Sequence, residues 1–566
     1  MKTLLIYPSA KGDSEQKDKH TNNIHDMEPL GIAYIGAICK KRGQEVKLIH
    51  QIDETNEELF KQIDEMQPDY LMLSALTFNF NNAVKIAEHV KEKYQGKVKT
   101  IIGGYHVSGS LLTEGETKVK QKIKDGTFDF VVNGEGEKTI DELLNYIESE
   151  NNNFSEVDGI AFYDKESKSV IINEKRDRLT NKELDEIGLP LREGLPMKRY
   201  KDLGFSFPPV EKQSFATIYS QRGCYGNCEF CQTPVVWNDR KSSCKKGGSG
   251  CNSCKSAEIC GFKKNRVTSR PTESIIEEIE YLIKEYGTNC LYFRDETFGV
   301  DKERANEFLD KMIEKGIGEK VKWTCMLRAD SIVDTEGNID KIFLNKLKDA
   351  GCHTIPIGIE HPLFLDRIKK GVTQEQIKLA FDAINEIGLK PMGLMMIGWP
   401  EETKESLDEV NNFIKDIKMD RVRISFVTPL DGTDLSKRAE LINKNTDADE
   451  MSTDKPVIHC PELEKQLGGQ SHVEYLEKKR DELLESVYNN EAYKERQKQH
   501  IINAEKIWGK KWRPLFLEST IENLKFIKEC EVKTFDSTDL EKLAKEKLKE
   551  IEEKKKPAML GGMKIK

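Results

Sequence analysis

The sequence has no apolar run long enough to span a bilayer. Its first residues, Met1–Pro8, are too short for a signal peptide and have the composition of a first strand. These two features argue against membrane insertion and secretion, so we expect a cytoplasmic protein. Hydrophobic residues make up 37% of the chain and charged residues 33%, which is typical of a highly charged globular protein and not of a disordered one.

The sequence also lacks an excess of basic residues. Its 89 Lys and Arg residues are outnumbered by 98 Asp and Glu residues, which gives a net charge of −9. Without a dominant positive field, nucleic acid is not the expected partner. A chain of 566 residues is long enough for more than one domain and for large buried cores.

Cysteine is unevenly distributed, because seven of the 13 cysteines lie between Cys224 and Cys260. In a protein without a secretion signal, such clustering favours metal ligation over disulfides. The other six are dispersed, mostly in apolar runs, and are expected in the core. They are Cys39, Cys290, Cys325, Cys352, Cys460 and Cys530.

The first three clustered cysteines, Cys224, Cys228 and Cys231, have the spacing C-x3-C-x2-C and follow a β-type run, Phe215–Tyr219. Three thiolates leave one iron of a four-iron cluster without a protein ligand, and that iron can chelate a substrate. The alternatives are cysteines that only pack in a core, or a structural zinc knuckle. Zinc knuckles favour paired C-x2-C spacings and a fourth ligand.

This array, with Phe230 just before its last cysteine, resembles the radical S-adenosylmethionine superfamily. The resemblance implies that the amino and carboxylate groups of S-adenosylmethionine bind the open iron. It further implies that an electron from the cluster cleaves the sulfonium to give a 5'-deoxyadenosyl radical, with Phe230 among the residues near the cofactor. An electron donor such as ferredoxin or flavodoxin is then a partner.

Strands and helices alternate between residues 214 and 435. Six βα-type repeats are too few for a closed eight-fold barrel, so we predict a partial barrel with its chemistry on the loops after the strands. The predicted strands are Phe215–Tyr219, Leu291–Asp295, Val321–Leu327, His353–Ile359, Pro391–Ile397 and Arg421–Val427. The predicted helices are Glu273–Glu285, Glu303–Glu314, Asp340–Asp349, Gln374–Ile387 and Lys404–Asp416.

The later strands of this barrel end in polar residues, in an order that is similar to the motifs of the same superfamily. The resemblance implies that Glu296 lies near the methionine amino group and that Arg328 pairs with the methionine carboxylate in a fork. It implies that Glu360 contacts the ribose or the amine, and that Gly398 and Pro400 form a turn beside adenine. For Glu360 and Arg328 the alternative is an ordinary structural ion pair.

An insertion at 240–268 carries four more cysteines, Cys244, Cys251, Cys254 and Cys260, in the spacing C-x6-C-x2-C-x5-C. So little apolar sequence surrounds them that packing is a poor explanation. Four thiolates can fully ligate an auxiliary 4Fe–4S cluster, which would relay electrons or hold the loop and would not cleave S-adenosylmethionine. The alternative is a zinc ion or a single iron that folds the loop. We favour the auxiliary cluster.

The first 150 residues alternate apolar strands with amphipathic helices, which predicts an α/β, doubly wound, Rossmann-like parallel sheet. The ligand site of such a sheet lies beyond the carboxyl ends of its strands, where glycines let the backbone approach a large ligand. The predicted strands are Thr3–Tyr7, Glu45–His50, Tyr70–Ala75, Val98–Ile102 and Phe128–Val132. The predicted helices are Ile32–Lys41, Glu57–Met66, Asn81–Lys93 and Lys138–Ile147.

Three segments of this region resemble the cobalamin-binding domain of cobalamin-dependent radical S-adenosylmethionine enzymes: Pro29–Tyr34, the Gly-Gly-x-His segment and the Gly-Glu-Gly-Glu segment. The resemblance implies cobalamin contacts from the loops after the strands. The residues concerned are Pro8, Gly31, Ser74, Thr77, Gly103, Gly104, His106, Gly134, Glu135 and Gly136. A domain that keeps the fold and has lost the cofactor is the alternative.

The D-x-H-x-x-G motif, which supplies a histidine to cobalt in methyltransferases, is absent from the loop after the first strand. His25 lies in that loop but not in that spacing. The lower face of cobalt should therefore lack a histidine ligand, and we expect Leu76–Phe80 to pack beneath the corrin.

Residues 151–213 form a connector with a predicted hairpin, Gly159–Tyr163 and Ser169–Asn173. Residues 436–566 have no strand pattern and are predicted to form charged, amphipathic helices that pack over the barrel mouth. Trp508, Trp512 and Phe516 either line a substrate channel there or form the core of this helical region.

Taken together, these features predict a cobalamin-dependent radical S-adenosylmethionine enzyme that methylates an unactivated carbon of a small-molecule, peptide or lipid substrate. The resemblance implies that one S-adenosylmethionine methylates cobalamin, and that a second yields the radical that removes a substrate hydrogen. One alternative is carbon–carbon bond formation, cyclisation or ring rearrangement, possibly on a lipid, without methyl transfer. Another is a non-enzymatic sensor or scaffold that carries a cluster.

Overall fold

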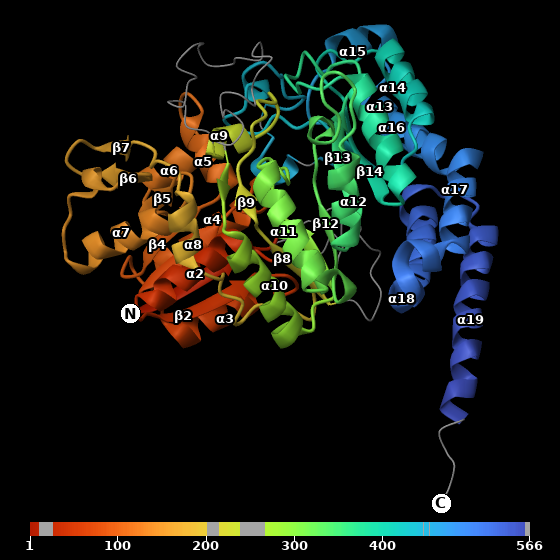
Figure 1. The fold of residues 1–566 in the computed structure, drawn as a ribbon. Coiled ribbons are helices and arrows are strands. Elements are labelled where there is room, and N and C mark those ends of the chain that lie inside the picture. Colours follow the sequence, from red (N-terminus) through yellow and green to blue (C-terminus); the bar gives the residue numbers. More distant parts are fainter. Residues whose placement is uncertain (11–26, 201–213, 238–266, 445, 452, 561–566) are drawn as a thin grey trace, which may run out of the picture.

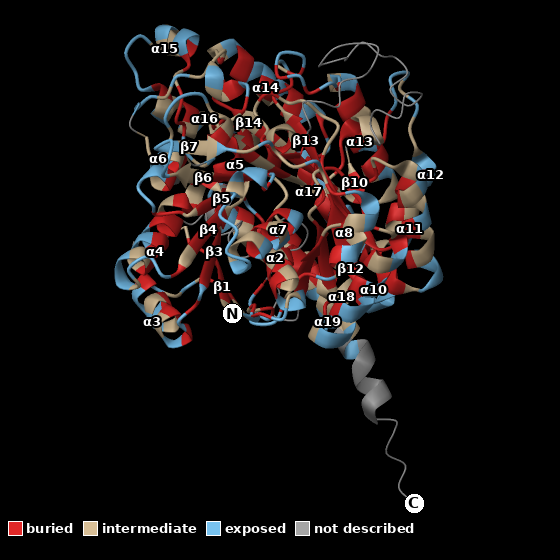
Figure 2. Cartoon of the chain, turned by 90° about the vertical axis from the view of Figure 1, so that its left-hand side faces the viewer, coloured by how far each residue is buried: buried red, intermediate tan, exposed pale blue. Residues whose placement is uncertain are grey.

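The computed structural model describes residues 1–10, 27–200, 214–237, 267–444, 446–451 and 453–560. Two large β-sheets lie side by side, each flanked by helices, and the carboxyl-terminal helices pack against the second of them (Figure 1). A small antiparallel sheet consists of β9 Gln221–Arg222 and β10 Thr268–Ser269. The strands of both large sheets are mostly buried, whereas the helices around them have a buried inner face and an exposed outer face (Figure 2).

The first sheet has the strand order β2-β1-β3-β4-β5-β6-β7, and its first five strands are parallel. Leu4 and Ile6 of β1 pack with helices α3 to α6 on one face, whereas Leu5 and Tyr7 pack with α2 and α7 on the other. Helices on both faces confirm the doubly wound fold. The strands are β1 Lys2–Tyr7, β2 Glu45–His50, β3 Tyr70–Ser74, β4 Lys99–Gly103 and β5 Phe130–Val132. The helices are α2 Leu30–Lys41, α3 Asn56–Met66, α4 Phe80–Lys93, α5 Tyr105–Leu112, α6 Lys118–Lys124 and α7 Glu137–Glu148.

Two parts of this sheet differ from the sequence-based prediction. Helices α5 and α6 were not predicted, because α5 contains glycine and serines with low helix propensity and α6 is short. The predicted hairpin exists as β6 Ile160–Asp164 and β7 Ser169–Ile172. It pairs antiparallel with β5 and so extends the first sheet at its edge.

The second sheet has six parallel strands in the order β15-β14-β13-β12-β11-β8. Among the described residues no pairing joins β15 to β8, so the barrel is open, as predicted. The strands are β8 Phe215–Ile218, β11 Cys290–Phe293, β12 Lys322–Cys325, β13 Cys352–Glu360, β14 Lys390–Ile397 and β15 Arg421–Phe426. The helices are α9 Thr233–Trp237, α10 Thr272–Tyr286, α11 Lys302–Glu314, α12 Lys341–Asp349, α13 Gln374–Ile387 and α14 Lys404–Asp416.

A buried ion-pair joint holds the two sheets together. The guanidinium of Arg192, in the chain between the sheets, lies 2.7 Å from Glu28 before α2 and 2.8 Å from Glu278 on α10. It also donates a hydrogen bond to the carbonyl oxygen of Thr217 on β8 (2.8 Å). All three charged side chains are at most 1% exposed. Because removing one partner would leave a buried charge uncompensated, the joint fixes how the sheets face each other.

Helices α17 Glu491–Ile502 and α18 Ala504–Phe526 cover the end of the barrel opposite to the cysteine loop. In contrast, α15 Pro461–Leu467 and the start of α16 His472–Tyr488 lie at the end that carries this loop, where Leu476 is next to Gly398. The ring of Trp508 lies 4.0 Å from that of His353, at the start of β13, and Lys390 at the start of β14 lies 4.3 Å from the ring of Phe516. Trp508, Trp512 and Phe516 belong to the main hydrophobic core. The alternative that these aromatics form part of a core is therefore confirmed, and the alternative of a substrate channel at the barrel mouth is wrong. The last helix is α19 Thr538–Leu560.

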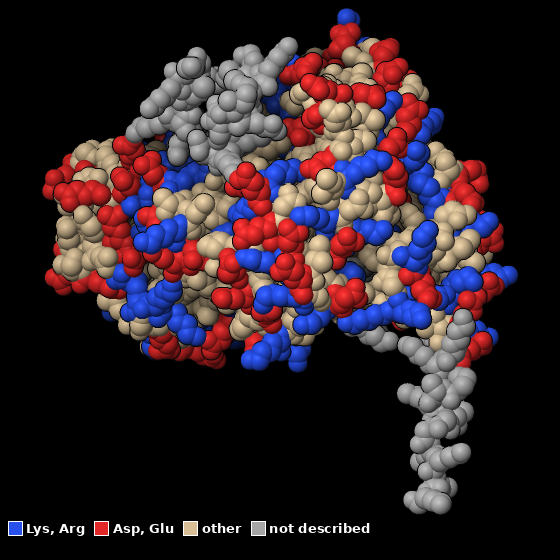
Figure 3. All heavy atoms as spheres, viewed as in Figure 1, with Lys and Arg blue, Asp and Glu red and all other residues tan. Residues whose placement is uncertain are grey.

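None of the helices in the described parts of the chain is long and apolar enough to cross a membrane. On the face shown in Figure 3, basic and acidic side chains are interspersed. This face thus has no single-sign patch of the kind that steers polyanions.

Candidate active site

The loop after β8 holds Cys224, Cys228 and Cys231 as free, partly exposed thiols. The first two sulfurs lie next to Gly226, 3.5 and 3.7 Å from the position of a Cβ on that residue. The sulfur of Cys231 is close enough to interact electrostatically with both. The backbone N–H of Gly226 donates to Cys224 Sγ (3.3 Å), and that of Thr233 donates to Cys231 Sγ (3.4 Å). The predicted thiols are thus gathered in one loop that supplies N–H donors to sulfur.

Burial raises the pKa of the Cys224 thiol, and it raises the pKa of Cys231 to about 12. Without a metal these thiols hold their protons, and metal binding must release them. Three clustered thiols with N–H···S contacts fit a 4Fe–4S cluster that lacks one protein ligand, since hydrogen bonds to the sulfurs stabilise such clusters.

Arg328, which follows β12, lies beside these cysteines. Its Nη1 is 3.2 Å from the Cβ position at Gly226, while its Nε donates to Tyr225 Oη (3.1 Å) and Asp330 Oδ1 (2.9 Å). Its Nη2 donates to the carbonyl oxygen of Lys370 (2.7 Å). Asp330 thus pairs with the Nε–Nη2 edge as a structural ion pair, and Nη1 is the nitrogen that faces the cysteine loop, where a carboxylate could accept from it.

Glu360 at the end of β13 pairs with Lys370 (Oε1–Nζ 2.7 Å), and the two side chains are 12% and 8% exposed. Glu360 has φ of +60°, a conformation that non-glycine residues rarely adopt and that is often found at functional sites. Burial lowers the pKa of Lys370, but Glu360 and Cys228 outweigh it and raise this pKa. Lys370 was not predicted as a site residue, because nothing in its local sequence indicates a buried lysine.

Phe230 and the Gly398–Pro400 turn lie together at the end of β14. The ring of Phe230 meets that of Trp399 edge-on, with centroids 5.8 Å apart. Gly398 has φ of +80°, and its N–H donates to Glu402 Oε2 (2.9 Å). The predicted adenine turn is therefore next to the cysteine loop.

Glu296, which follows β11, connects the two sheets. Its carboxylate accepts hydrogen bonds from the hydroxyl of Tyr105 on α5 (3.0 Å) and from the N–H of Gly223, next to the first cysteine (2.9 Å). Trp237 Nε1 also donates to the Tyr105 hydroxyl. Burial raises the pKa of Glu296. The hydroxyl of Tyr105, on a helix that flanks the first sheet, is thus linked through the Glu296 carboxylate to the cysteine loop.

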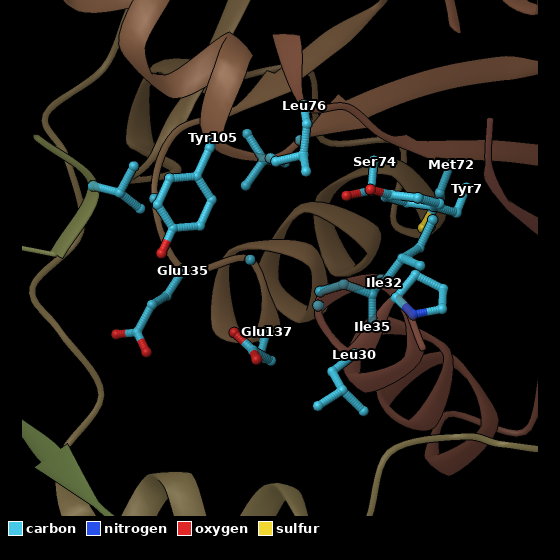
Figure 4. Close-up of a pocket in the computed structure, with 18 of the residues that line it drawn as sticks. Tyr7, Leu30, Ile32, Ile35, Met72, Ser74, Leu76, Tyr105, Glu135 and Glu137 are labelled. Atoms are coloured by element: carbon cyan, nitrogen blue, oxygen red, sulfur yellow. The ribbon is translucent and has the colours of Figure 1, made fainter. Parts of the chain in front are cut away.

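Between the sheets lies a cavity with about 1290 Å³ of space between the atoms, part of it open to solvent. Its walls are mostly apolar, from α2 and the carboxyl ends of β1, β3 and β4, while Glu135, Glu137 and Tyr105 lie toward the second sheet (Figure 4). Seven of the predicted cobalamin contacts line it: Gly31, Ser74, Gly103, Gly104, Gly134, Glu135 and Gly136. Leu76, at the start of the segment expected beneath the corrin, lines it too.

The cavity depends on Gly104. This residue has φ of +113°, and a Cβ on it would lie 2.4 Å from the carbonyl oxygen of Ala75. Only glycine fits this close approach of the ends of β3 and β4. The loop therefore presents bare backbone to the cavity, which suits a flat macrocycle such as a corrin.

Pro8, Thr77 and His106 are not among the residues that line this cavity. His106 is buried against Phe80 (ring centroids 4.4 Å apart), and its Nδ1 is 3.3 Å from Thr77 Oγ1. Burial lowers the pKa of His106 to about 4, so the ring is neutral at pH 7. The carbonyl oxygen of Pro8 accepts from Asn79 Nδ2 (3.0 Å). These residues form the layer behind the cavity wall.

Arg222 links the Gly-Glu-Gly-Glu segment to the cysteine loop, two residues before Cys224. Its guanidinium contacts Glu135 Oε1 (3.0 Å) and Glu137 Oε1 (2.6 Å), and all three side chains are at most 6% exposed. It also lies 5.0 Å from the ring centroid of Tyr34. The sequence showed the two glutamates but gave no indication that their partner lies two residues before the cysteine loop.

A second arginine, Arg294 at the end of β11, lines the cavity from the barrel side together with Tyr219, and Tyr7 of β1 lines it too. Its Nη1 donates to the sulfur of Met27 (3.1 Å), which is a weak acceptor. The guanidinium is therefore suited to a carbonyl, carboxylate or phosphate oxygen of a ligand in the cavity. The sequence pattern around Arg294 predicted a site residue at Glu296 but not at Arg294 itself.

The insertion cysteines Cys244, Cys251, Cys254 and Cys260, and His25, lie outside the described residues. The auxiliary cluster therefore stays a prediction.

Two family models match the chain. The one described as a B12 binding domain matches residues 24–144, and the one described as the radical SAM superfamily matches residues 218–414. Together they include more than half of the chain. The first range contains the glycine loops of the cavity, and the second contains the cysteine loop.

Curated relatives are similar along most of the chain. An uncharacterised methyltransferase of Pyrococcus horikoshii is 28% identical over 77% of this chain and 82% of its own length. The cytidylyl-2-hydroxyethylphosphonate methyltransferase of Streptomyces wedmorensis is 23% identical over 82% of this chain and 86% of its own. An anaerobic magnesium-protoporphyrin IX monomethyl ester cyclase of Cereibacter sphaeroides is 25% identical over 71% of this chain but only 58% of its own length.

Two solved structures share the fold. The cobalamin-dependent S-adenosylmethionine radical enzyme OxsB has a TM-score of 0.60 and 15% identity, covering 100% of this chain and 81% of its own. The radical S-adenosylmethionine methyltransferase TsrM of Kitasatospora setae has a TM-score of 0.57 and 15% identity, covering 84% and 88%. At this identity the likeness concerns the arrangement of domains and not the reaction.

Proposed function

The chain belongs to the cobalamin-dependent radical S-adenosylmethionine enzymes, and from this premise we propose that it transfers a methyl group to an unactivated carbon of its substrate. The observation that carries the proposal is the cavity between the two domains, which both Arg222 and the Tyr105–Glu296 contact connect to the cysteine loop. The methyltransferases among the relatives support the same reaction.

In this proposal each domain holds one cofactor. Cys224, Cys228 and Cys231 hold the 4Fe–4S cluster, and the glycine loops hold cobalamin. When bound, the cofactors supply the reductive cleavage of S-adenosylmethionine and the methyl group. The chain supplies placement, because groups fixed in one cavity react as if at very high local concentration.

Particular residues have particular roles in that placement. Arg328 binds the methionine carboxylate, since its Nη1 faces the cysteine loop and its other nitrogens are held by Asp330 and Lys370. Glu360, oriented by Lys370, binds the amine or the ribose, and the Gly398–Pro400 turn contacts adenine. A ferredoxin or a flavodoxin delivers the electron, and the substrate is a small molecule, peptide or lipid.

Product counting tests the reaction. We expect the reduced holoprotein with S-adenosylmethionine to form one equivalent of S-adenosylhomocysteine per bound cobalamin before any substrate is added. With a substrate, S-adenosylhomocysteine and 5'-deoxyadenosine should form in equal amounts, because methyl transfer uses two molecules of S-adenosylmethionine. Formation of 5'-deoxyadenosine alone would contradict methyl transfer and favour the second candidate.

The second candidate is a radical carbon–carbon bond formation, cyclisation or ring rearrangement without methyl transfer. The cyclase among the relatives favours it, although this chain spans only 58% of that protein. Cobalamin could then be lost or be used in another way, so cobalt content together with the product ratio separates the two reactions.

Occlusion of the cavity tests the cobalamin site. Gly31 on α2 lines the cavity, and a Cβ on it meets nothing within 4 Å. We expect Gly31→Trp to place an indole in the cavity and to weaken cobalamin binding roughly tenfold or more, with thermal stability and iron content unchanged. Gly31→Ala is the matched control and should bind normally. A full complement of cobalt in Gly31→Trp would place cobalamin elsewhere.

The proposed auxiliary cluster at Cys244, Cys251, Cys254 and Cys260 is tested by metal analysis after anaerobic purification. About eight irons per chain would support two clusters, and about four irons with one zinc would support a structural zinc loop.

A further inference from the structure

Two histidines and a glutamate form a cluster on the rim of the barrel, separate from the cysteine loop and from the residues that line the cavity. His459 follows an extended segment, Glu464 is on α15, and His472 is the first residue of α16. Their side chains are 37%, 34% and 10% exposed, so an ion from solvent can reach them.

The geometry of the cluster is close to that of metal ligands. His459 Nδ1 lies 2.9 Å and His472 Nδ1 lies 3.4 Å from the same oxygen, Glu464 Oε1. The three potential ligand atoms all lie within 4.8 Å of one another. Neighbouring ligands of a tetrahedral zinc ion, with bonds of about 2.0–2.1 Å, are about 3.3 Å apart. Shifts of less than about 2 Å between the ligand atoms, a slight widening at His459–Glu464 among them, would therefore bring all three to an ion.

The hydrogen bonding of His472 also points to a cation. Its Nε2 lies 3.3 Å from the carbonyl oxygen of Ile458. A carbonyl only accepts, so Nε2 carries the proton, and in the neutral ring Nδ1 directs a lone pair toward the Glu464 carboxylate. Two acceptors that face each other need a cation between them, either a second proton on the ring or a metal. Histidine ligands of metals typically donate their other ring N–H to a carbonyl in this way.

The residues around the cluster leave three side chains as protein ligands. Cys460, next to His459, is fully buried and is not among the residues whose ligand atoms come together here. Its backbone N–H donates to Glu464 Oε1 (3.0 Å), which fixes the carboxylate at the start of α15. Two imidazoles and one carboxylate are a ligand set that zinc accepts, with water in the fourth position.

The cluster also holds a segment that supports the active site. Ile458 belongs to a small buried core with Trp399, against which Phe230 of the cysteine loop packs. An ion bound by His459, Glu464 and His472 would tie α15 and α16 to this segment. We propose that these three residues bind a divalent transition-metal ion, zinc by its fit, which fixes the segment 458–472 on the barrel rim. Such a metal site would be independent of the reaction that the enzyme catalyses.

Zinc titration of the reconstituted holoenzyme, after dialysis against a chelator, tests the site. We expect Glu464→Gln and His472→Ala to bind one zinc fewer per chain than the unmodified protein, with the affinity of this site at least about 100-fold lower. Glu462→Gln, on the same helix and paired only with Lys465 among the described contacts, is the matched control and should keep the ion. Because only the difference in bound zinc between the variants is used, zinc that cysteines elsewhere in the chain bind does not affect the result.

A second readout separates metal binding from misfolding. Zinc should raise the Tm of the unmodified protein and of Glu462→Gln, and it should leave the Tm of Glu464→Gln unchanged. Glu464→Gln is isosteric and keeps the acceptor for the Cys460 N–H, so it decides the matter even if His472→Ala fails to fold. Equal zinc binding in Glu462→Gln and Glu464→Gln, or none in the unmodified protein, would show that the histidines pair with Glu464 through protons alone.

Discussion

Replacement of any one of Cys224, Cys228 and Cys231 by alanine is expected to reduce 5'-deoxyadenosine formation below detection. The three thiols lie in one loop and together leave one iron of a 4Fe–4S cluster open to S-adenosylmethionine. With one thiolate removed, a second iron loses its protein ligand and the cluster is lost or misplaced. The assay measures 5'-deoxyadenosine under strong reductant, with iron analysis of the same sample. A loss of about four irons per chain should accompany the loss of product.

The matched control is Cys39→Ala. Cys39 is fully buried at the end of α2, and burial raises the pKa of its thiol to about 12, so it does not supply a thiolate. We expect this variant to keep both iron and activity. If alanine at 224, 228 or 231 leaves 5'-deoxyadenosine formation undiminished, the assignment of the cluster to this loop is wrong.

Replacement of Arg222 by methionine is expected to lower the free energy of unfolding by about 3–5 kcal/mol, because it leaves Glu135 and Glu137 as buried, uncompensated carboxylates. Methionine retains much of the apolar stem, so the lost charge dominates the effect. Denaturant unfolding measures the loss. Cobalamin binding should weaken too, since both glutamates line the cavity.

A rescue experiment separates charge from packing. In the Arg222→Met background, Glu135→Gln and Glu137→Gln remove the uncompensated charges, and much of the lost stability should return. Lys61→Met, which removes the exposed Lys61–Glu57 pair, is the control and should leave the unfolding midpoint unchanged. If the triple variant is no more stable than Arg222→Met, the pairing of Arg222 does not hold the two domains together.

Two groups of buried ion pairs hold the two domains together. Arg192 connects Glu28 of the first domain to Glu278 of the second, and Arg222 connects two cavity glutamates to the cysteine loop. Both are buried, so their geometry is rigid and little affected by salt. The placement of the cavity relative to the cysteine loop is thus set by buried contacts and not by a flexible linker.

The sequence by itself determined the strands of both large sheets and most of the helices, though not α5 and α6, since apolar periodicity is a local property. It also determined the C-x3-C-x2-C loop, because its three ligands lie within eight consecutive residues. Most glycine positions of the cavity were predictable for the same reason: they follow directly after strands, and the carboxyl ends of parallel strands share one edge.

Only the tertiary structure decided which distant side chains meet. Arg222 between Glu135 and Glu137, and Tyr105 on Glu296, join segments far apart in sequence, and Lys370 comes beside Glu360 only because the loop between them turns back. The helices after residue 460 show the same limit, because an amphipathic pattern gives a helix its apolar face but not the end of the barrel that it covers. That choice depends on packing against strand ends such as those at His353 and Lys390. Local pattern fixes the elements, whereas the pairing of buried charges and apolar faces between them is a property of the folded chain.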